Sequence, residues 1–561
     1  MRSTLCRSCM IFKSRSARLV MAWAAMSLGV CTVTNAAGPF GSSSLQAAID
    51  RAQPGDKVVI PPGTYRESIQ IAHSGTPQRP ITIEAAVGNV VITGADRLET
   101  AKWEPLPGRP VWRYSSWTYQ APTRRVLDSA RVYSGEQVIV DGRLLARAAS
   151  LESMQAGTFF TDPIKDHALF LWLSDGGSPS KHTVEASVRP LLLKITSNYI
   201  IVRNIRFRYA SNLAQQGAVQ VNGEHNYVEN CVVGYTAGVG FTLGGRHNIV
   251  RRVTSGFNGQ MGMGASGQDN LLEECRLIHN NTLDYPTEWE AGGIKVVLSD
   301  RFRISRCLAT DNNGVGFWFD IDNRDGVIEQ SYAADNEVGI MVEISQRITV
   351  RNNVAVRNGL ERGKWWMSGI LIAESMDSLV ENNLCVDNLT GIEVRQQGVR
   401  VVPASSEPGR TEPVRFCSDA LVFRHNISAF NRKWQFAFFG DNPFFGGKYL
   451  WVIRRLFEKG DRADAVDMQL LNPSKWNWRM DHNVYFAQSG SGLILWGAPW
   501  LTGHTAYDSL DTFRKDHQLD QDSIVADPEF ADRSRGDFTL RPGSPAVKLY
   551  SSPSRSGQHK P

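Results

Sequence analysis

Two carboxylates stand at matching places in two glycine-led segments. Asp320 ends the run Gly-Phe-Trp-Phe-Asp that begins at Gly316, and Glu343 ends the run Gly-Ile-Met-Val-Glu that begins at Gly339. The two acids are 23 residues apart. When two carboxylates lie close together, repulsion raises the pKa of one, which keeps its proton while the other stays ionised. A proton donor beside an anion is the pair of groups that cleaves a glycosidic bond.

Five segments share the glycine-led pattern, and their alternation predicts strands with one common outer face. The first and third residues after each glycine are aliphatic or aromatic, so they should point inward, and the second and fourth outward. The second-position residues are Lys295, Trp318, Met341, Leu371 and Glu393. The fourth-position residues are Val297, Asp320, Glu343, Ala373 and Arg395. Strands stacked in register would place Asp320 and Glu343 on backbones roughly 4.8 Å apart.

That separation suits a retaining glycosidase, whose carboxyl groups are about 5–5.5 Å apart, better than an inverting one. Trp318 on the same face could stack on a sugar ring. Four polar residues could hydrogen-bond sugar hydroxyls or a uronate: Lys295, Asp322, Glu393 and Arg395. Glu374 just beyond the fourth position, and Trp365 in an insertion, could reach the same groove. A cation site and a plain solvated surface are the alternatives for the two acids.

A repeat of about 22 residues must position these groups. An apolar residue, two polar residues and then Cys, Asn or a small residue recur, with leads at Val228, Val250, Leu272, Ile304, Ile328, Val350 and Val380. The steps are 22, 22, 32, 24, 22 and 30 residues, so two coils carry insertions. Short alternating strands separated by Asn and Gly indicate β structure. Coils that bury their apolar side chains only against neighbouring coils form a solenoid. The sequence therefore predicts an all-β fold, a right-handed parallel β-helix.

Two side-chain columns should run inside this solenoid. Three cysteines share one position of the repeat: Cys231, Cys275 and Cys307. We expect buried free thiols stacked in the core. Three asparagines recur 22 residues apart: Asn226, Asn248 and Asn270. We expect them to stack at a turn.

The repeat divides the chain into five stretches. Residues 1–36 have a basic start, a short apolar run and small residues at Thr34-Asn35-Ala36, which is typical of a signal peptide. The remaining predicted stretches are a cap with the first coils (37–101), an inserted β-rich, sandwich-like domain (102–190), the main β-helix (191–430), and C-terminal coils with long insertions and a closing segment (431–561). We therefore expect a protein that is secreted or periplasmic and has no membrane partner once the presequence is cleaved.

Composition narrows the class of partner. The formal net charge is +5 over 561 residues, which argues against nucleic acid as the main partner. The histidines and cysteines show no metal-ligand spacing, so we expect no metal and no cofactor. The expected partner is an oligosaccharide or polysaccharide substrate.

Several motifs resemble known families. Gly63-Thr64-Tyr65-Arg66-Glu67 resembles the opening coil of secreted β-helix enzymes of the pectate-lyase-like superfamily. The Gly316–Asn323 and Gly339–Ser345 segments are similar to glycoside hydrolase family 120, the β-xylosidase family, which adds a β-sandwich domain to a β-helix. The resemblance covers about residues 40–430. It implies that Asp320 is the nucleophile and Glu343 the acid/base.

A second resemblance points to a different reaction. Glu288-Trp289-Glu290, followed by Lys295, resembles the calcium-binding Glu-x-Glu and catalytic lysine of polysaccharide lyase family 6. It implies Lys295 as a base and a possible Ca²⁺. That family places an arginine on the next coil, where this chain has Asp320, and a second acid there would oppose binding of a uronate. A non-catalytic carbohydrate-binding β-helix is the third alternative.

The sequence as a whole favours a retaining glycoside hydrolase that acts on a plant or microbial poly- or oligosaccharide. Its predicted catalytic residues are Asp320 and Glu343. Its predicted substrate-binding residues are Lys295, Trp318, Asp322, Glu288, Glu290, Glu374, Glu393, Arg395 and Trp365.

Overall fold

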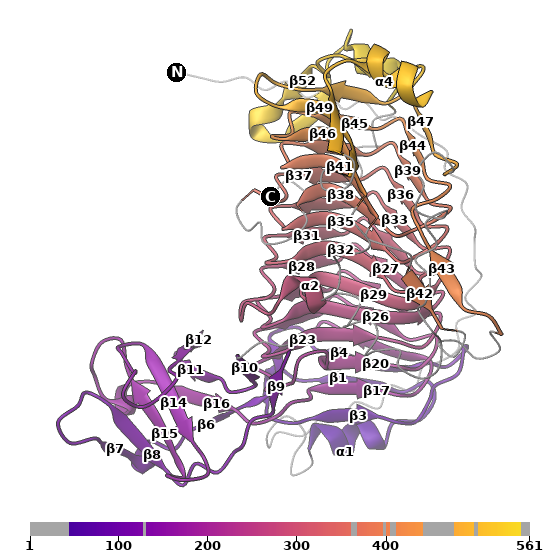
Figure 1. The fold of residues 1–561 in the computed structure, drawn as a ribbon. Helices are drawn as coiled ribbons and strands as arrows, with labels where there is room; N and C mark the ends of the chain where they lie inside the picture. Colours follow the sequence, from indigo (N-terminus) through magenta and orange to yellow (C-terminus); the bar gives the residue numbers. More distant parts are fainter. Residues whose placement is uncertain are drawn as a thin grey trace, which may run out of the picture.

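The computed structural model describes residues 44–126, 131–360, 367–396, 400–403, 411–440, 476–498 and 503–550. Trp365 and the predicted signal peptide lie outside these ranges. The described chain winds into a right-handed parallel β-helix, which rises in Figure 1 from helix α1 (Leu45–Asp50) to helix α4 (Leu510–His517). The predicted fold class is therefore confirmed. No helix within the described ranges is long and apolar enough to span a membrane.

Three long sheets form the walls of the helix. Sheet 1 contains β1 (Lys57–Ile60), β4 (Ile81–Ala85), β18 (Ile200–Arg203), β21 (Tyr227–Glu229), β24 (Ile249–Arg251), β27 (Leu271–Glu273), β30 (Arg303–Ser305), β33 (Val327–Glu329), β36 (Thr349–Arg351), β39 (Leu379–Glu381), β44 (Val422–Arg424) and β47 (Arg479–Asp481). Sheet 2 contains β2 (Gly63–Tyr65), β5 (Val90–Thr93), β19 (Arg206–Arg208), β22 (Val232–Gly234), β25 (Thr254–Gly256), β28 (Arg276–Ile278), β31 (Leu308–Thr310), β34 (Tyr332–Ala334), β37 (Val354–Val356), β40 (Leu384–Val386), β45 (Ile427–Ala429), β48 (Val484–Phe486) and β51 (Ile524–Val525). Sheet 3 contains β3 (Ile69–Ile71), β17 (Leu193–Ile195), β20 (Gly217–Val221), β23 (Val239–Leu243), β26 (Met261–Gln268), β29 (Gly292–Asp300), β32 (Val315–Asp320), β35 (Val338–Glu343), β38 (Ser368–Ala373), β41 (Thr390–Gln396), β46 (Trp434–Gly440), β49 (Gly492–Ala498) and β50 (Gly503–Tyr507).

The two ends of the stack are closed differently. At the start, Leu45 and Ile49 of α1 are buried against the first coil, and Ser44 caps this helix by accepting a hydrogen bond from the Ala47 amide. At the other end, β50 runs antiparallel to β49, and Leu510 and Phe513 of α4 join the core there. Two short antiparallel strands, β52 (Phe530–Asp532) and β53 (Asp537–Leu540), complete this end.

A second β domain is inserted between β5 and β17 and projects from the α1 end of the stack (Figure 1). Its strands are β6 (Ala95–Arg97), β7 (Trp103–Pro105), β8 (Trp112–Ser115), β9 (Thr123–Arg125), β10 (Val132–Ser134), β11 (Val138–Val140), β12 (Arg143–Leu144), β13 (Ala146–Arg147), β14 (Thr158–Asp162), β15 (Ala168–Trp172) and β16 (Val184–Ser187). They form one four-stranded sheet, one five-stranded sheet and the β9–β10 hairpin. The predicted insertion at 102–190 falls within this stretch.

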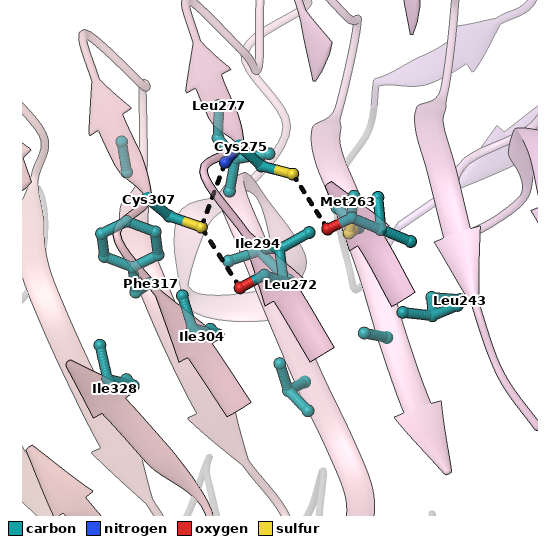
Figure 2. Packing of buried hydrophobic residues seen from close by; sticks show 14 of the residues in the cluster. Leu243, Met263, Leu272, Cys275, Leu277, Ile294, Ile304, Cys307, Phe317 and Ile328 are labelled. Carbon is teal, nitrogen blue, oxygen red and sulfur yellow. Dashed lines mark hydrogen bonds between the residues drawn. The ribbon is translucent and has the colours of Figure 1, made fainter. Parts of the chain in front are cut away.

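The core of the helix contains the inward residues of each coil. Ile294, Phe317 and Ile340 are register partners on successive strands of sheet 3, and all are buried. Figure 2 shows part of this packing, with Cys275 and Cys307 between Leu272, Ile294 and Phe317. The cysteines are free and buried, and the Cys275 amide donates to Cys307 Sγ at 3.4 Å. The predicted burial of the three thiols is confirmed, and Cys275 stacks on Cys307, whereas Val253 lies between Cys231 and Cys275 in the column.

Asparagine ladders line the corners of the coil, and one of them runs from Asn353 through Asn383 and Asn426 to Asn483. In the predicted ladder, the Asn226 amide donates to Asn248 Oδ1 and the Asn248 amide to Asn270 Oδ1, each at 2.9 Å. A longer ladder at another corner was not predicted. It links Asn258, Asn280, Asn312, Asn336, Asn358, Asn388 and Asn431 through the same kind of bond. Each side chain thereby satisfies a buried backbone donor of the preceding coil.

The long ladder gives a test of coil stability. Replacing Asn336 by alanine removes the acceptor for the buried Asn312 amide, and an unsatisfied buried donor costs about 1–3 kcal/mol. We expect Asn336→Ala to lower the midpoint of urea unfolding. Asn89→Ala, at an exposed turn, is the control and should leave the midpoint in place. Equal midpoints for both variants would contradict a stabilising role for the ladder.

Candidate active site

Three successive strands of sheet 3 bring the candidate residues together. Lys295 on β29 is the register partner of Trp318 on β32, and Asp320 on β32 is the partner of Glu343 on β35. The structure thus makes the two acids neighbours on adjacent coils, as the repeat length predicts. Their surroundings differ from the expected open surface, because Asp320 is 4% and Glu343 5% exposed.

Lys295 is fixed by three contacts. Its Nζ lies 2.8 Å from Asp320 Oδ2, donates to the Trp289 carbonyl at 3.1 Å, and lies 4.1 Å from the centre of the Trp318 ring. Burial acts to lower the pKa of Lys295, but the Asp320 carboxylate, with Glu290 and Glu343, more than offsets burial and raises this pKa above its usual value. Lys295 is therefore a cation that holds the Asp320 carboxylate in place.

Glu343 has the opposite character. Burial, followed by the charge of Asp320, raises its pKa well above the usual value for glutamate, while Arg400 and Lys295 act in the other direction. Glu343 therefore keeps its proton at pH values where an ordinary carboxyl has lost it. The pair consists of a carboxylate bound by Lys295 and a carboxyl group that keeps its proton to higher pH than usual.

The backbone directly after each acid is in an uncommon conformation. Ile321 has φ 58° and Ile344 has φ 46°, which is the left-handed region. A β-branched residue rarely adopts it, and such strain gathers at functional sites. Hydrogen bonds between coils hold these turns, since the Leu298 amide donates to the Ile321 carbonyl at 2.8 Å and the Ile344 amide to the Ala373 carbonyl at 3.1 Å. These turns fix the backbone directly after Asp320 and Glu343, and thereby the positions of the two side chains.

The structure places Trp318 behind Lys295 and not at an open surface. Its side chain is 1% exposed and packs in an apolar cluster with Val315, Met341 and Leu371. Its Nε1 is buried and makes no hydrogen bond within the described residues. The prediction that Trp318 stacks on a sugar is therefore corrected. The Trp318 ring is buried, and the Lys295 ammonium group lies over its face.

The remaining predicted residues lie on both sides of the acid pair. Glu374 is fully buried at the end of β38 and acts electrostatically on Glu343. Asp322 is buried 3.6 Å from Arg324 Nε. Glu393 and Arg395 lie two coils beyond Glu343 and bind each other at 2.6 Å.

The Glu-x-Glu segment forms helix α2 (Thr287–Glu290). Glu288 is exposed, whereas Glu290 Oε2 accepts a hydrogen bond from Gln215 Nε2 at 2.7 Å. Within the described ranges, the one group of three His, Cys, Asp or Glu side chains with converging ligand atoms is Asp481, His482 and Asp522, at the last strand of sheet 1. The two glutamates of α2 do not belong to such a group.

An insertion brings Arg400 to the site, which sequence reasoning did not predict. Arg400 begins strand β42 (Arg400–Val402), which pairs with β43 (Val414–Phe416) in an antiparallel hairpin. Val402 and Phe416 of the hairpin pack with Ile344 at the turn after Glu343. Arg400 Nη2 consequently lies 3.8 Å from Glu343 Oε1. No repeat links this hairpin to the coils, so its position could not be inferred from the periodicity.

The inserted domain also reaches the site through its β9–β10 hairpin. Tyr133 stacks on Tyr285 with ring centres 3.7 Å apart, and its hydroxyl donates to the Asp284 carbonyl at 3.0 Å. Arg124 lies over the Trp289 ring at 5.3 Å. The hairpin therefore packs against the loop whose Trp289 carbonyl accepts the Lys295 hydrogen bond. This contact joins two parts of the chain that are about 150 residues apart in sequence.

Comparisons with known proteins agree with the fold. A family model described as the right-handed β-helix region matches residues 217–383, and a chondroitinase B model matches residues 41–102. The structure of XylC in complex with xylose is similar over 88% of this chain and 85% of that chain, with a TM-score of 0.63 and 16% identity. A family 6 polysaccharide lyase from Pseudopedobacter saltans matches over 91% of this chain and 97% of that chain, with a TM-score of 0.46 and 12% identity.

A curated relative adds a short local match. The uncharacterized protein YwoF of Bacillus subtilis (strain 168) is 40% identical over 67 residues, which is 12% of this chain and 13% of YwoF. At these identities and coverages, the comparisons establish a right-handed β-helix fold.

The contact between the inserted domain and the site loop can be tested directly. Tyr133→Ala removes the stack on Tyr285 and the hydrogen bond to Asp284. We expect faster amide hydrogen exchange in residues 281–291, because local opening becomes easier when packing contacts are lost. Tyr133→Phe keeps the stack and should give a smaller increase. Unchanged exchange in Tyr133→Ala would show that the hairpin does not hold the loop.

Proposed function

We propose that this protein is a carbohydrate-active enzyme and, more specifically, a retaining glycoside hydrolase. The observation that carries the proposal is the position of Asp320, which Lys295 contacts at 2.8 Å, directly beside Glu343 on the next coil. Strand spacing of roughly 4.8 Å is close to the separation of carboxyl groups in retaining enzymes. The fold likeness to XylC, a structure determined with xylose, supports a sugar as substrate.

The proposed first step uses both groups. Glu343 donates its proton to the glycosidic oxygen as that oxygen leaves, and the Asp320 carboxylate attacks the anomeric carbon to form a glycosyl-enzyme ester. Lys295 holds the attacking carboxylate in position through its 2.8 Å contact. In the second step Glu343, now ionised, takes a proton from water as the water oxygen attacks the anomeric carbon and releases Asp320.

The runner-up is a polysaccharide lyase with Lys295 as the base. A base must be unprotonated, yet Asp320 holds Lys295 as a cation. A lyase of the family 6 type would also require a site for Ca²⁺ at α2, with Glu288 as a ligand. Among the described residues, Glu288 does not belong to a group of side chains whose ligand atoms converge. A non-catalytic binding protein would not need two buried acids side by side. We propose that the enzyme acts in the periplasm or outside the cell after cleavage of residues 1–36, on an oligosaccharide or polysaccharide.

Removing either carboxyl group tests the hydrolase. Asp320→Asn and Glu343→Gln should each lower turnover of 4-nitrophenyl glycosides by about 10²–10⁴-fold or more, because each removes a group that acts in the transition state. Circular dichroism should be unchanged. Glu381→Gln, which alters a surface acid paired with Arg424, is the control and should keep full activity.

Azide distinguishes the acid/base from a structural residue. A small anion can replace water in the second step, so azide should restore turnover of an activated aryl glycoside by Glu343→Ala and yield a glycosyl azide. If both Asp320→Asn and Glu343→Gln still hydrolyse the substrate, the assignment of the protein as a retaining glycoside hydrolase is wrong. Ultraviolet absorbance from an unsaturated sugar during digestion of uronate polymers, lost in Lys295→Ala, would instead establish the lyase.

The pH profile tests the role of Arg400. A general acid is active while protonated, so activity falls as pH rises through the pKa of Glu343. Arg400 acts to lower this pKa. Arg400→Gln should therefore raise the pKa of Glu343 and move the alkaline limb of kcat/KM to higher pH. Arg400→Lys keeps the charge and should keep the profile closer to the original one. A shift toward lower pH in Arg400→Gln would contradict this assignment.

A further inference from the structure

The outer face of sheet 1 has a column of apolar side chains along its middle. Val202, Val250 and Leu272 are aligned in the core, so the residues on either side of each point outward. From β21 to β44 the residues before the inward ones form a half-buried column, which Arg303 and Thr349 interrupt: Tyr227, Ile249, Leu271, Val327, Leu379 and Val422. An apolar centre with a polar rim is the usual composition of a protein–protein contact.

Charged residues border this column on both sides, and their sign changes from one coil to the next. On one side the register partners from β4 to β27 are Glu84, Arg203, Glu229, Arg251 and Glu273. After Ser305 on β30, the series continues from β33 to β47 with Glu329, Arg351, Glu381, Arg424 and Asp481. On the other side, two residues before the strands β27 to β39, are Asp269, Arg301, Asp325, Arg347 and Asp377. At these positions each coil has a single sign, opposite to that of its neighbours.

Ion pairs within the chain leave these groups accessible. Arg347 Nε lies 2.8 Å from Asp325 Oδ1, yet the two side chains are 46% and 42% exposed. Arg424 Nη2 lies 2.8 Å from Glu381 Oε2, and its side chain is 50% exposed. A guanidinium has five N–H donors, so an exposed arginine that binds one carboxylate can bind a second one. The face can therefore contact a partner and keep the ion pairs between its own coils.

The alternation of charge selects the kind of partner. A polyanion or polycation laid along the stack would meet like charges as often as opposite ones. A second copy of the same face is complementary when it is antiparallel and a two-fold axis, parallel to the strands, passes midway between two coils. Each positive coil then faces a negative coil of the partner. With the two-fold axis along the stack instead, each coil would face its own equivalent and like charges would meet.

The size of the face also suits a second copy. Ten steps of roughly 4.8 Å separate β4 from β47, and five residues of extended chain span about 16 Å, so the face covers roughly 800 Å². A stable interface of standard size buries about 800 Å² on each partner. The two ends of the stack are closed by α1 and β50, so a second copy has to approach from the side.

We propose that two copies of this chain associate in antiparallel orientation through the outer face of sheet 1. The apolar columns of the two copies pack along the middle of the contact, and the alternating charges on both sides fix its direction and offset. The proposal does not depend on the proposed hydrolase, because Asp320 and Glu343 lie on sheet 3.

Sedimentation velocity of the full chain tests the association. We expect a dimer at about 10 μM, with a dissociation constant that rises at least about tenfold between roughly 0.05 and 0.5 M NaCl as salt screens the charges. A monomer at every concentration up to about 100 μM would overturn the proposal. A monomer that binds heparin or polylysine through this face would overturn it as well.

A substitution in the apolar column locates the contact. Val327→Lys places a cation between Asp325 and Glu329 of the same coil, which suits the folded chain, but it opposes the positive coil of the partner. We expect the dissociation constant to rise at least about tenfold. The control is Ile164→Lys, which changes an apolar residue of the inserted domain that is 70% exposed, and it should leave the constant within about twofold. Dimers that are equally stable in both variants would contradict the assignment of this face.

A second substitution keeps the test decisive if Val327→Lys does not fold. Thr349→Glu places an anion between Arg347 and Arg351, where it suits its own coil and opposes the negative coil of the partner. Circular dichroism and the midpoint of urea unfolding should stay close to those of the parent chain. A folded Thr349→Glu variant that dimerises as tightly as the parent would rule out the proposed contact.

A spin label at Asn204→Cys tests the direction of packing. Asn204 is exposed beside β18, near one end of the face, and the native cysteines of the described residues are buried, so the label attaches selectively. In the antiparallel dimer the two labels lie near opposite ends and should be more than about 30 Å apart, because several coil steps of roughly 4.8 Å separate them. Labels within about 20 Å of each other would show a parallel dimer and overturn the proposed orientation.

Discussion

The backbone of each coil hydrogen-bonds chiefly to the coil before it and the coil after it. The backbone N–H and C=O groups of a buried turn must therefore hydrogen-bond to the neighbouring coils along the axis of the stack. The asparagine ladders meet this requirement, because one side chain accepts from the backbone amide of the preceding coil at each step. The ladder continues across the long coils, from Asn280 to Asn312, from Asn358 to Asn388 and from Asn388 to Asn431. Insertions consequently leave the register unchanged, and Asp320 meets Glu343 on the next strand.

The site depends on this register and on burial in equal measure. Asp320 and Glu343 are close because their coils are stacked, and both are removed from water, but Asp320 has Lys295 at 2.8 Å whereas Arg400 lies 3.8 Å from Glu343. Burying a charge is costly unless it is paired. The Lys295–Asp320 pair is thus an arrangement that stability alone would not favour, which is the pattern expected of a residue pair kept for chemistry. On sheet 1 the cations of the charged pairs are exposed, as in the pairs of Arg351 with Glu329 and Arg424 with Glu381.

The sequence predicts those parts of the molecule that repeat. Coil length, the cysteine stack, the first asparagine ladder and the neighbouring positions of Asp320 and Glu343 all follow from the period. The burial of the outer face was not predicted, although Phe317-Trp318-Phe319 is apolar on both faces of its strand, as in strands covered on two sides. Arg400 and Tyr133 could not be placed at all. Each belongs to an insertion, and the position of an insertion on the coils depends on long-range contacts that leave no period in the sequence.

The closed ends of the stack have a consequence for how copies of this chain meet. A parallel β-helix ends in a strand edge and an apolar cross-section, and both would be a template on which another copy could add coils. Here α1 covers the first cross-section, and β50 reverses direction on the last strand of sheet 3. A coil arriving from a second molecule would meet α1 over the core at the first end and a reversed strand on sheet 3 at the last end. Growth into a filament is blocked by the same elements that complete the fold of a single chain.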